Sequence, residues 1–341
     1  MCMYFTKGIN QNGYILCRQC NMKKYEHPIF MYIYIITSQC DDIVLLIQEY
    51  IKVDNYNNIA GGYNHTIALL QDNTIECWGD NRSEQCDVPD SVQGKVLSIA
   101  CGTGYSCALL NDNTIVCWGD NDRGQCDVPD SIQGKVVSID CGDGHCVALL
   151  NDNTIKCWGY NNCKQCTPPD SIQGKVQSSA CSHSHSCVLL NDNTIKHWGD
   201  NHCEQCDVPD SVQGKVVLIK CGYDFSCALL NDNSIKCWGD NYFGQLNVPD
   251  SIQGKAVSID CGDYYSIALL NDNTIKCWGN NYYGICHIPE GIQKKIVSIY
   301  CGFSHSIALL NDNSIKCWGD NYYDQCNPPD SIQGKIMYRV Q

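Results

Sequence analysis

The chain has 341 residues, 44% of them hydrophobic and 18% charged, and a formal net charge of −14 at pH 7. This acidity argues against a nucleic-acid partner, because affinity for phosphate backbones depends on Lys and Arg releasing counterions. The apolar run at residues 29–36 is far too short to span a bilayer, and no secretory signal opens the sequence. We therefore expect an intracellular, cytoplasmic monomer with neither nucleic acid nor membrane as a partner.

Residues 1–54 are predicted to form an N-terminal extension of unknown role. One helix is expected from Gln39 to Ile51, where Ser38 followed by Asp41 offers a capping start and apolar residues follow. A zinc site is an alternative with four possible ligands, Cys17, Cys20, His27 and Cys40. Their spacing lacks a tandem-knuckle pattern, so an ordinary cysteine-rich segment is favoured and no metal is predicted.

Beyond the extension, the sequence repeats itself with a period of 40 residues and no insertion. Such a fixed period is typical of proteins in which each unit buries its apolar face against its neighbours. The seven tryptophans mark the repeats: Trp78, Trp118, Trp158, Trp198, Trp238, Trp278 and Trp318. As the largest residue of each unit, each tryptophan is expected to anchor packing within or between repeats.

Within one repeat the pattern indicates β-structure. Strands are expected at Val136–Asp140, Cys146–Leu150 and Thr154–Trp158, with a short fourth strand around Cys166. The intervening "NDN" is a tight-turn signal, because Asn and Asp tolerate the left-handed conformation. The predicted fold class is therefore all-β, a seven-bladed β-propeller over residues 55–341.

The two ends of the repeat region compete for one strand position. Residues 335–341 match the first-strand segment of the repeats, yet residues 56–60 already occupy that place in repeat one. We expect the C-terminal strand to close the ring, because an unpaired final strand would leave an open edge.

The series "IDCG", "ALLNDNTIKCWGDN" and "GQC.VPDS" resembles the repeat of the regulator of chromosome condensation superfamily. The 40-residue length is closest to that of the propeller-type β-lactamase inhibitor protein. The resemblance covers about four-fifths of the chain and implies a propeller. Its members serve as nucleotide-exchange factors, ubiquitin-ligase modules or plain binding proteins. Uniform repeats without a protruding wedge, on an acidic chain, argue against exchange activity and chromatin binding.

The 28 cysteines are interpreted from their positions in the repeats. Cys107, Cys187 and Cys227 share a position that holds Ile or Val in the other repeats, which indicates a small buried hydrophobe. Cys237 persists although Leu246 replaces its would-be partner. We therefore expect reduced, packed thiols. Two Cys-x-x-Cys pairs, at residues 163–166 and 203–206, raise a zinc alternative that we do not favour.

No catalytic constellation is predicted. His65, His145, His185 and His305 share one position, which we call the ring column, and Tyr or Phe fills it in the other repeats. The requirement is therefore a flat ring rather than a titrating base. Catalysis needs a singular set of residues, whereas every candidate here recurs, so we expect no enzyme and no cofactor.

Two short loops vary from repeat to repeat, residues 63–65 and 82–84 with their equivalents. In an antiparallel blade both emerge on one side, which we call the variable-loop face, and loops on a rigid scaffold commonly carry recognition. Aromatic residues concentrate there in repeats five to seven and are the predicted binding site: Tyr223, Phe225, Tyr242, Phe243, Tyr264, Tyr265, Tyr282, Tyr283, Phe303, Tyr322 and Tyr323.

The sequence thus favours a non-enzymatic scaffold that binds an unidentified protein partner. Regulation of a small GTPase by nucleotide exchange is one alternative, and a lectin-like propeller that binds small ligands on aromatic platforms is another.

Overall fold

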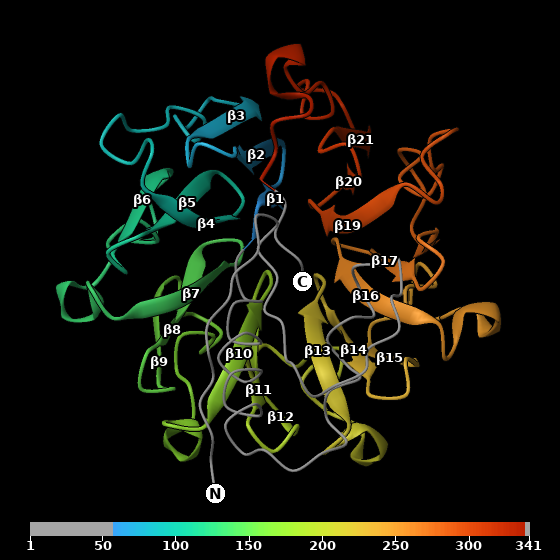
Figure 1. Cartoon of the computed structure of the whole chain (residues 1–341). Helices are drawn as coiled ribbons and strands as arrows, with labels where there is room; N and C mark the ends of the chain where they lie inside the picture. Colours follow the sequence, from blue (N-terminus) through green and yellow to red (C-terminus); the bar gives the residue numbers. More distant parts are fainter. Residues whose placement is uncertain (1–56, 338–341) are drawn as a thin grey trace, which may run out of the picture. The chain divides into compact units, whose positions relative to one another are not determined.

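A computed structural model describes residues 57–337 of the chain. The expected helix at residues 39–51 and the N-terminal zinc alternative lie outside these residues. The described part contains seven separate three-stranded antiparallel sheets, each a blade, arranged in a ring (Figure 1). The first strands of the blades line a central channel. Within residues 57–337, no helix is long and apolar enough to cross a membrane. The seven-bladed, all-β prediction is confirmed.

Each blade has an inner, a middle and an outer strand. The inner strands are β1 Ile59–Gly61, β4 Val96–Cys101, β7 Val136–Cys141, β10 Val176–Cys181, β13 Val216–Cys221, β16 Ala256–Cys261 and β19 Ile296–Cys301. The middle strands are β2 His65–Leu69, β5 Tyr105–Leu110, β8 His145–Leu150, β11 His185–Leu190, β14 Phe225–Leu230, β17 Tyr265–Leu270 and β20 His305–Leu310. The outer strands are β3 Ile75–Gly79, β6 Ile115–Gly119, β9 Ile155–Gly159, β12 Ile195–Gly199, β15 Ile235–Gly239, β18 Ile275–Gly279 and β21 Ile315–Gly319.

The tight turn between the middle and outer strands forms as predicted. In blade two, Asn113 has φ of 63°, the left-handed conformation that asparagine tolerates. The Asp112 carboxylate accepts hydrogen bonds from the backbone N–H and the hydroxyl of Thr114, at 3.1 and 2.6 Å. Local side-chain acceptors therefore hold this turn.

The predicted fourth strand is wrong: each described sheet has three strands. Around Cys166 the chain turns instead, because the Cys166 N–H donates to the Asn161 side chain at 2.8 Å. The outer edge of the blade is paired by a glutamine of the linker. Gln173 accepts from the Ile155 N–H at 2.9 Å and donates back to the Ile155 carbonyl at 3.5 Å. This side chain satisfies groups that a fourth strand would have paired.

The linker also carries short 3₁₀ turns before that glutamine. They are η3 Asp130–Ile132, η4 Asp170–Ile172, η5 Asp210–Val212, η6 Asp250–Ile252 and η7 Asp330–Ile332. The isoleucine or valine that ends each turn is buried, so it fastens the linker to the blade.

The hydrophobic core lies between blades rather than within them. One cluster joins Leu109 and Ile115 of blade two to Ile139 and Trp158 of blade three. All seven tryptophans are 6–8% exposed. The Trp158 indole N–H donates to the Gln125 carbonyl of the preceding blade at 3.0 Å. This confirms the tryptophans as anchors, and they act between blades.

The ring column supplies a second joint. His145 is completely buried, and its Nε2 lies 2.9 Å from the Ser186 hydroxyl of the next blade. In blade two, Tyr105 occupies the same position, and its hydroxyl donates a hydrogen bond to the His145 carbonyl of the next blade at 2.7 Å. Burial lowers the pKa of His145 to about 3. The column is therefore structural, as predicted, and His145 is neutral near pH 7.

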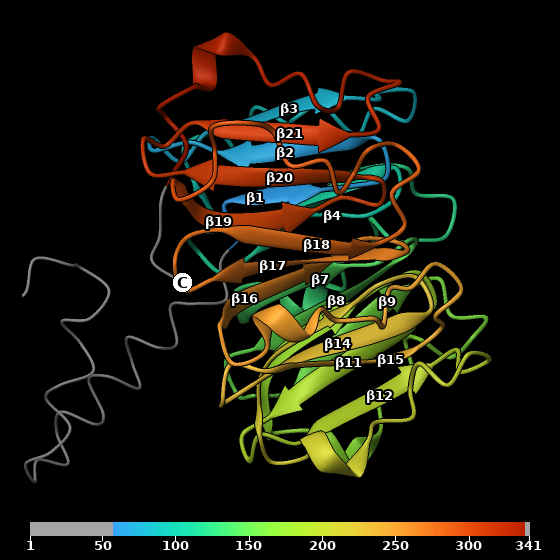
Figure 2. The same ribbon diagram turned by 90° about the vertical axis from the view of Figure 1, so that its right-hand side faces the viewer.

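Blade seven (β19–β21) lies against blade one (β1–β3) and closes the ring (Figure 2). The Trp78 indole donates to the Gln325 carbonyl at 3.0 Å across this joint. Ile336 forms a β-bridge with Leu70, and the Met337 N–H donates to the Leu69 carbonyl at 2.9 Å. The C-terminal segment thus pairs with blade one as expected, but it shares the inner-strand position with β1, which also pairs with β2.

The expectation of reduced thiols is wrong for six cysteines, which form three disulfides: Cys107–Cys117, Cys227–Cys237 and Cys277–Cys286. The first two join directly opposed residues on the middle and outer strands, in the two repeats that have cysteine at both positions. Cys237 persists beside Leu246 because it bonds to Cys227 instead. A second type of pair links the outer strand to the following loop, as in Cys277–Cys286.

Among residues 57–337 the other thiols remain free, including the two Cys-x-x-Cys pairs. In blade one, the Cys77 and Cys86 sulfurs lie 2.7 Å apart without a bond. Among residues 57–337, the one group of three or more possible metal ligands that converges is Cys107, Cys117 and Cys146, and two of these are disulfide-bonded.

Replacing Cys227 by valine, the residue that blade three has at this position, should remove a disulfide while preserving apolar packing. The bond closes a loop of 10 residues, for which chain-entropy arguments give about 2–3 kcal/mol of stabilisation. Denaturant titration of oxidised protein should show that loss. A matched C187V variant, which removes a free thiol, should show much less. Peptide mapping without reductant that finds no Cys227–Cys237 link would contradict the assignment.

Candidate functional site: the variable-loop face

The two variable loops meet on one face, as the sequence predicts. Arg123, from the second loop of blade two, donates to the carboxylate of Asp143, from the first loop of blade three, at 2.9 Å. The tight turns lie at the other end of the blades beside the linkers, where the Gly134 N–H donates to the Asn113 carbonyl at 3.1 Å. The loops that differ between repeats are therefore gathered on the side away from the constant turns.

The first loops also bond to one another around the mouth of the channel. The Tyr223 N–H donates to the Asp263 carbonyl at 3.0 Å, and the Asp263 N–H donates to the Phe303 carbonyl at 3.1 Å. The Phe303 N–H in turn donates to the Gly62 carbonyl of blade one at 3.2 Å. The channel behind them has a cavity of about 130 Å³ that Asp263 and Phe303 help to line. Side chains at these positions thus encircle the channel mouth.

Aromatic rings form a continuous run across blades four to six. His183 stacks on Tyr223 with centroids 4.1 Å apart, and Tyr223 lies 5.3 Å from Tyr264. Phe243 lies 5.1 Å from Tyr264 and 4.8 Å from Tyr242. These separations are typical of favourable aromatic pairs. The run brings together four of the predicted residues and adds His183.

Further pairs extend the aromatic surface over blades six, seven and one. The ring centroids are 4.9 Å apart in Tyr282–Tyr283, 4.8 Å in Tyr322–Tyr323 and 5.2 Å in Tyr63–Phe303. Tyr242, Tyr282 and Tyr322 are 83%, 81% and 82% exposed. Rings this accessible, gathered on one face, are available to a partner.

Two of the predicted residues do not belong to this surface. Phe225 and Tyr265 are 0% exposed, so their assignment to the binding site is wrong. Each begins a middle strand and occupies the ring column, where its side chain packs under a glycine. A Cβ on Gly222 would lie 1.9 Å from the Phe225 ring. The residue at the third position of the first loop thus faces the joint between blades rather than the solvent.

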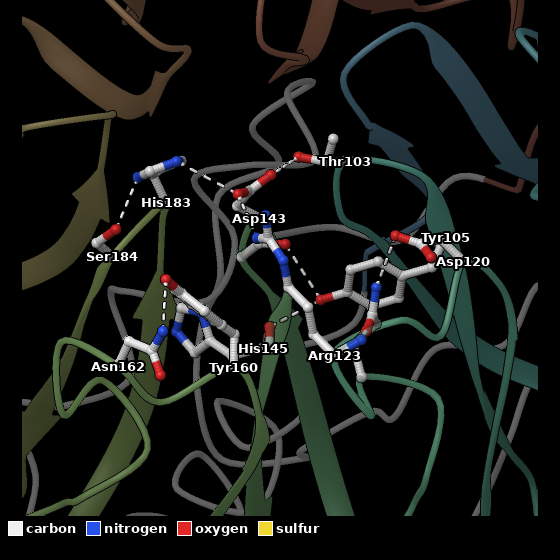
Figure 3. A network of polar contacts seen from close by, with 12 residues as sticks. Thr103, Tyr105, Asp120, Arg123, Asp143, His145, Tyr160, Asn162, His183 and Ser184 are labelled. Carbon is white, nitrogen blue, oxygen red and sulfur yellow. Dashed lines mark hydrogen bonds and ion pairs between the residues drawn. The ribbon is translucent and has the colours of Figure 1, made fainter. Parts of the chain in front are cut away.

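A polar network occupies the same face in blades two to four (Figure 3). The Asp143 carboxylate accepts a hydrogen bond from the Thr103 hydroxyl, is ion-paired with Arg123 at 2.9 Å, and lies 3.3 Å from His183 Nε2. The Arg123 guanidinium lies over the Tyr160 ring, 4.6 Å from its centroid. This part of the face is internally satisfied.

Carboxylates without such partners lie among the aromatic rings. Burial raises the pKa of Asp263 well above its ordinary value, and the negative charges of Asp143 and Asp224 raise it further. Burial and the nearby charge of Asp263 raise the pKa of Tyr264 to about 12. The mouth of the channel therefore combines aromatic rings with a carboxyl group whose ionised form is disfavoured by burial and by neighbouring carboxylates.

Sequence reasoning missed Tyr63, His183 and Asp263 as members of this surface. All three occupy the same repeat position as Tyr223 and Phe303, which were predicted. Comparing that whole position, rather than aromatic residues in repeats five to seven alone, would have found them.

Seven antiparallel blades, built from repeats of equal length and joined by buried tryptophans and a column of rings, define a seven-bladed β-propeller. The chain belongs to the Regulator of chromosome condensation (RCC1) repeat family. The family model matches residues 57–85, 96–125, 136–165, 176–205, 216–245, 256–285 and 296–325. A search of curated protein sequences found no match.

Several solved structures share the fold. The ectodomain of the Physcomitrella patens receptor kinase CR4 aligns with a TM-score of 0.65 and 22% identity, over 77% of this chain and 74% of that one. The CRINKLY ectodomain of the Arabidopsis thaliana receptor kinase ACR4 gives 0.64 and 22%, over 79% and 97%. Prp20p of Saccharomyces cerevisiae, whose binding to Gsp1p and histones is described, gives 0.61 and 18%, over 86% and 89%. At these identities the likeness shows the fold alone.

Proposed function

We propose that this protein is a non-enzymatic scaffold that binds another protein through the aromatic part of its variable-loop face. The observation that carries the proposal is the set of three tyrosines, Tyr242, Tyr282 and Tyr322, each more than 80% exposed at the same position of consecutive blades. Exposing such rings to water is unfavourable unless a partner covers them, and tyrosine is enriched at interface hot spots.

The rigidity of the ring supports this proposal. Seven interblade cores and the shared joints hold the loops in place, so little ordering entropy is lost when a partner binds. The titratable residues of the ring column are buried and engaged between blades, which leaves them unsuited to acid–base catalysis. The face therefore offers recognition rather than chemistry.

Affinity capture with two matched variants tests the proposal. The aromatic variant replaces four residues by alanine: Tyr242, Phe243, Tyr282 and Tyr283. The control variant replaces the corresponding residues of blades one and two by alanine: Arg82, Ser83, Asp122 and Arg123. The aromatic variant should capture at least tenfold less of the main partner while its melting temperature is nearly unchanged. The control variant should capture as much partner as the parent chain.

Equal capture by both variants would reject the aromatic surface as the binding site. Two further assays address the other classes of function. Stimulated release of guanine nucleotide from a small GTPase would favour an exchange regulator, and saturable binding on a glycan array would favour a lectin-like propeller. Either result, with unchanged capture by the aromatic variant, would overturn the scaffold proposal.

A further inference from the structure

Two arginines of this chain show what kind of cation the variable-loop face accommodates. The Arg82 guanidinium lies 4.4 Å from the ring centroid of Tyr323, on the adjacent blade, and donates to Asp80 at 2.9 and 2.7 Å. Arg123 lies over Tyr160 and pairs with Asp143 (Figure 3). In both cases a planar cation combines a tyrosine face with an aspartate. Guanidinium suits this arrangement because it stacks on rings while it donates in its own plane.

Blades five to seven present the same two ingredients, and the Lys220 ammonium that shares the channel lining with Asp263 pairs instead with Asp260, at 3.4 Å. Every ion pair on this face within residues 57–337 belongs to Arg82, Arg123, His183 or His202. The Asp263 carboxylate has no ion pair and no side-chain hydrogen bond among these residues. It lies in the channel-mouth lining between Tyr223 and Phe303, to which its backbone is bonded.

The electrostatics of the mouth show that this carboxylate is uncompensated. Asp143 and Asp224 both add negative charge at Asp263, and the pKa of Asp224 is itself raised, first by burial and then by Asp200. Asp224 accepts one side-chain hydrogen bond, from Gln205 at 3.3 Å. A partly buried carboxylate without a counter-charge is unfavourable, and a cation supplied from outside relieves that cost.

We propose that the channel mouth beside blades five and six binds an arginine of a basic segment on the protein partner. Asp263 holds the guanidinium, Tyr223 and Tyr264 provide the neighbouring ring faces, and further cations of the segment lie on the exposed Tyr242 and Tyr282. This inference rests on the proposed function and specifies the chemistry of its partner.

The surface favours this occupant over other classes of partner. A chain with net charge −14 repels acidic segments and phosphates. A purely apolar segment would cover the tyrosines but would bury Asp263 and Asp224 without compensation. Lysine would satisfy the charge, but its ammonium is more strongly hydrated and cannot stack as a plane.

A peptide titration tests the inference directly. Fluorescence anisotropy follows the binding of a labelled nonapeptide with three arginines, separated by Gly and Ser, to the purified full-length chain. Two matched peptides replace arginine by lysine or by citrulline, which keeps the shape of arginine and removes its charge. The citrulline peptide should bind at least tenfold more weakly than the arginine peptide, and the lysine peptide should lie between them.

Variants of the protein then locate the site. D263N removes the charge but keeps the shape, and Y264L removes a ring face. Each substitution should lower the affinity for the arginine peptide at least fivefold. D90N neutralises an exposed carboxylate in the first linker, on the opposite face, and should leave affinity unchanged. Melting temperatures confirm that each variant is folded.

Equal binding of the arginine and citrulline peptides, or unchanged affinity of D263N, would overturn the inference. Equal affinity for spermidine alone would also overturn it, because it would assign the mouth to a small polycation rather than to a protein segment. If the arginine peptide does not bind, but the aromatic variant still captures less partner than the parent chain, the inference fails and the scaffold function stands.

Discussion

Replacing Trp158 by alanine is expected to lower the free energy of unfolding by about 3–5 kcal/mol, the range for truncating a buried tryptophan. The side chain is 7% exposed and packs in the core between blades two and three. Its indole N–H is hydrogen-bonded to the Gln125 carbonyl, so truncation removes an apolar anchor and an interblade bond together. Denaturant titration measures the loss.

A Trp158→Phe variant separates the two contributions. It keeps much of the apolar area and loses the hydrogen bond, whose net worth is about 1 kcal/mol, so it should fall between the parent and Trp158→Ala. Trp238 is similarly buried, at 6% exposed, and its indole N–H makes the equivalent hydrogen bond to the Gln205 carbonyl at 3.0 Å, so its alanine variant should lose a similar amount of stability. Unfolding curves that match the parent would show that stability resides elsewhere.

Acidification from pH 7 to pH 5 is expected to destabilise the propeller through three buried histidines of its ring column. Burial lowers the pKa of His65 to about 4 and those of His145 and His305 to about 3. Histidine in the unfolded state has a pKa near 6.5, so below that pH the unfolded state binds more protons than the folded state and is stabilised relative to it. Their stability contribution is complete above pH 6.5 and is lost as the pH falls toward 4 and 3.

The expected size follows from the same numbers. At pH 5 each histidine has lost about 2 kcal/mol, or about 6 kcal/mol for the three. Buried His197, whose pKa lies well below its ordinary value, adds to the loss. Asp140, Asp224 and Asp263 work in the opposite direction, because burial raises their pKa values; Asp140, at about 6, returns about 1 kcal/mol over this range. The net loss should be measurable as a fall in the free energy of unfolding between pH 7 and pH 5.

His305→Tyr provides the matched variant, since tyrosine occupies this column at Tyr265. There the hydroxyl donates to the His305 carbonyl at 2.6 Å and to the Gly302 carbonyl at 3.1 Å. Gly62 and His65 offer the equivalent carbonyls in the next blade. The variant should match the parent near pH 8 and recover about 2 kcal/mol at pH 5. Identical pH profiles for both proteins would contradict the assignment of the acid sensitivity to this column.

The sequence by itself determined the number of blades, the order of their strands and the face on which the variable loops gather. These features follow from local signals repeated in register: alternating apolar strands, "NDN" turns and one tryptophan every 40 residues. The repeat period also predicted that the ring column is structural, because histidine, tyrosine and phenylalanine exchange there. Applied consistently, that same column would have excluded Phe225 and Tyr265 from the binding site.

Only the tertiary structure decided which groups each blade offers to its neighbours. A glutamine of the linker pairs the blade edge where a fourth strand was expected, because its amide reaches the Ile155 backbone across 18 residues. Cys227 and Cys237 bond because antiparallel pairing sets them directly opposite each other, which comparison of single repeat positions does not show. The environment of the Asp263 carboxylate likewise depends on the packing of neighbouring blades, since the loops bonded to its own come from the blades on either side.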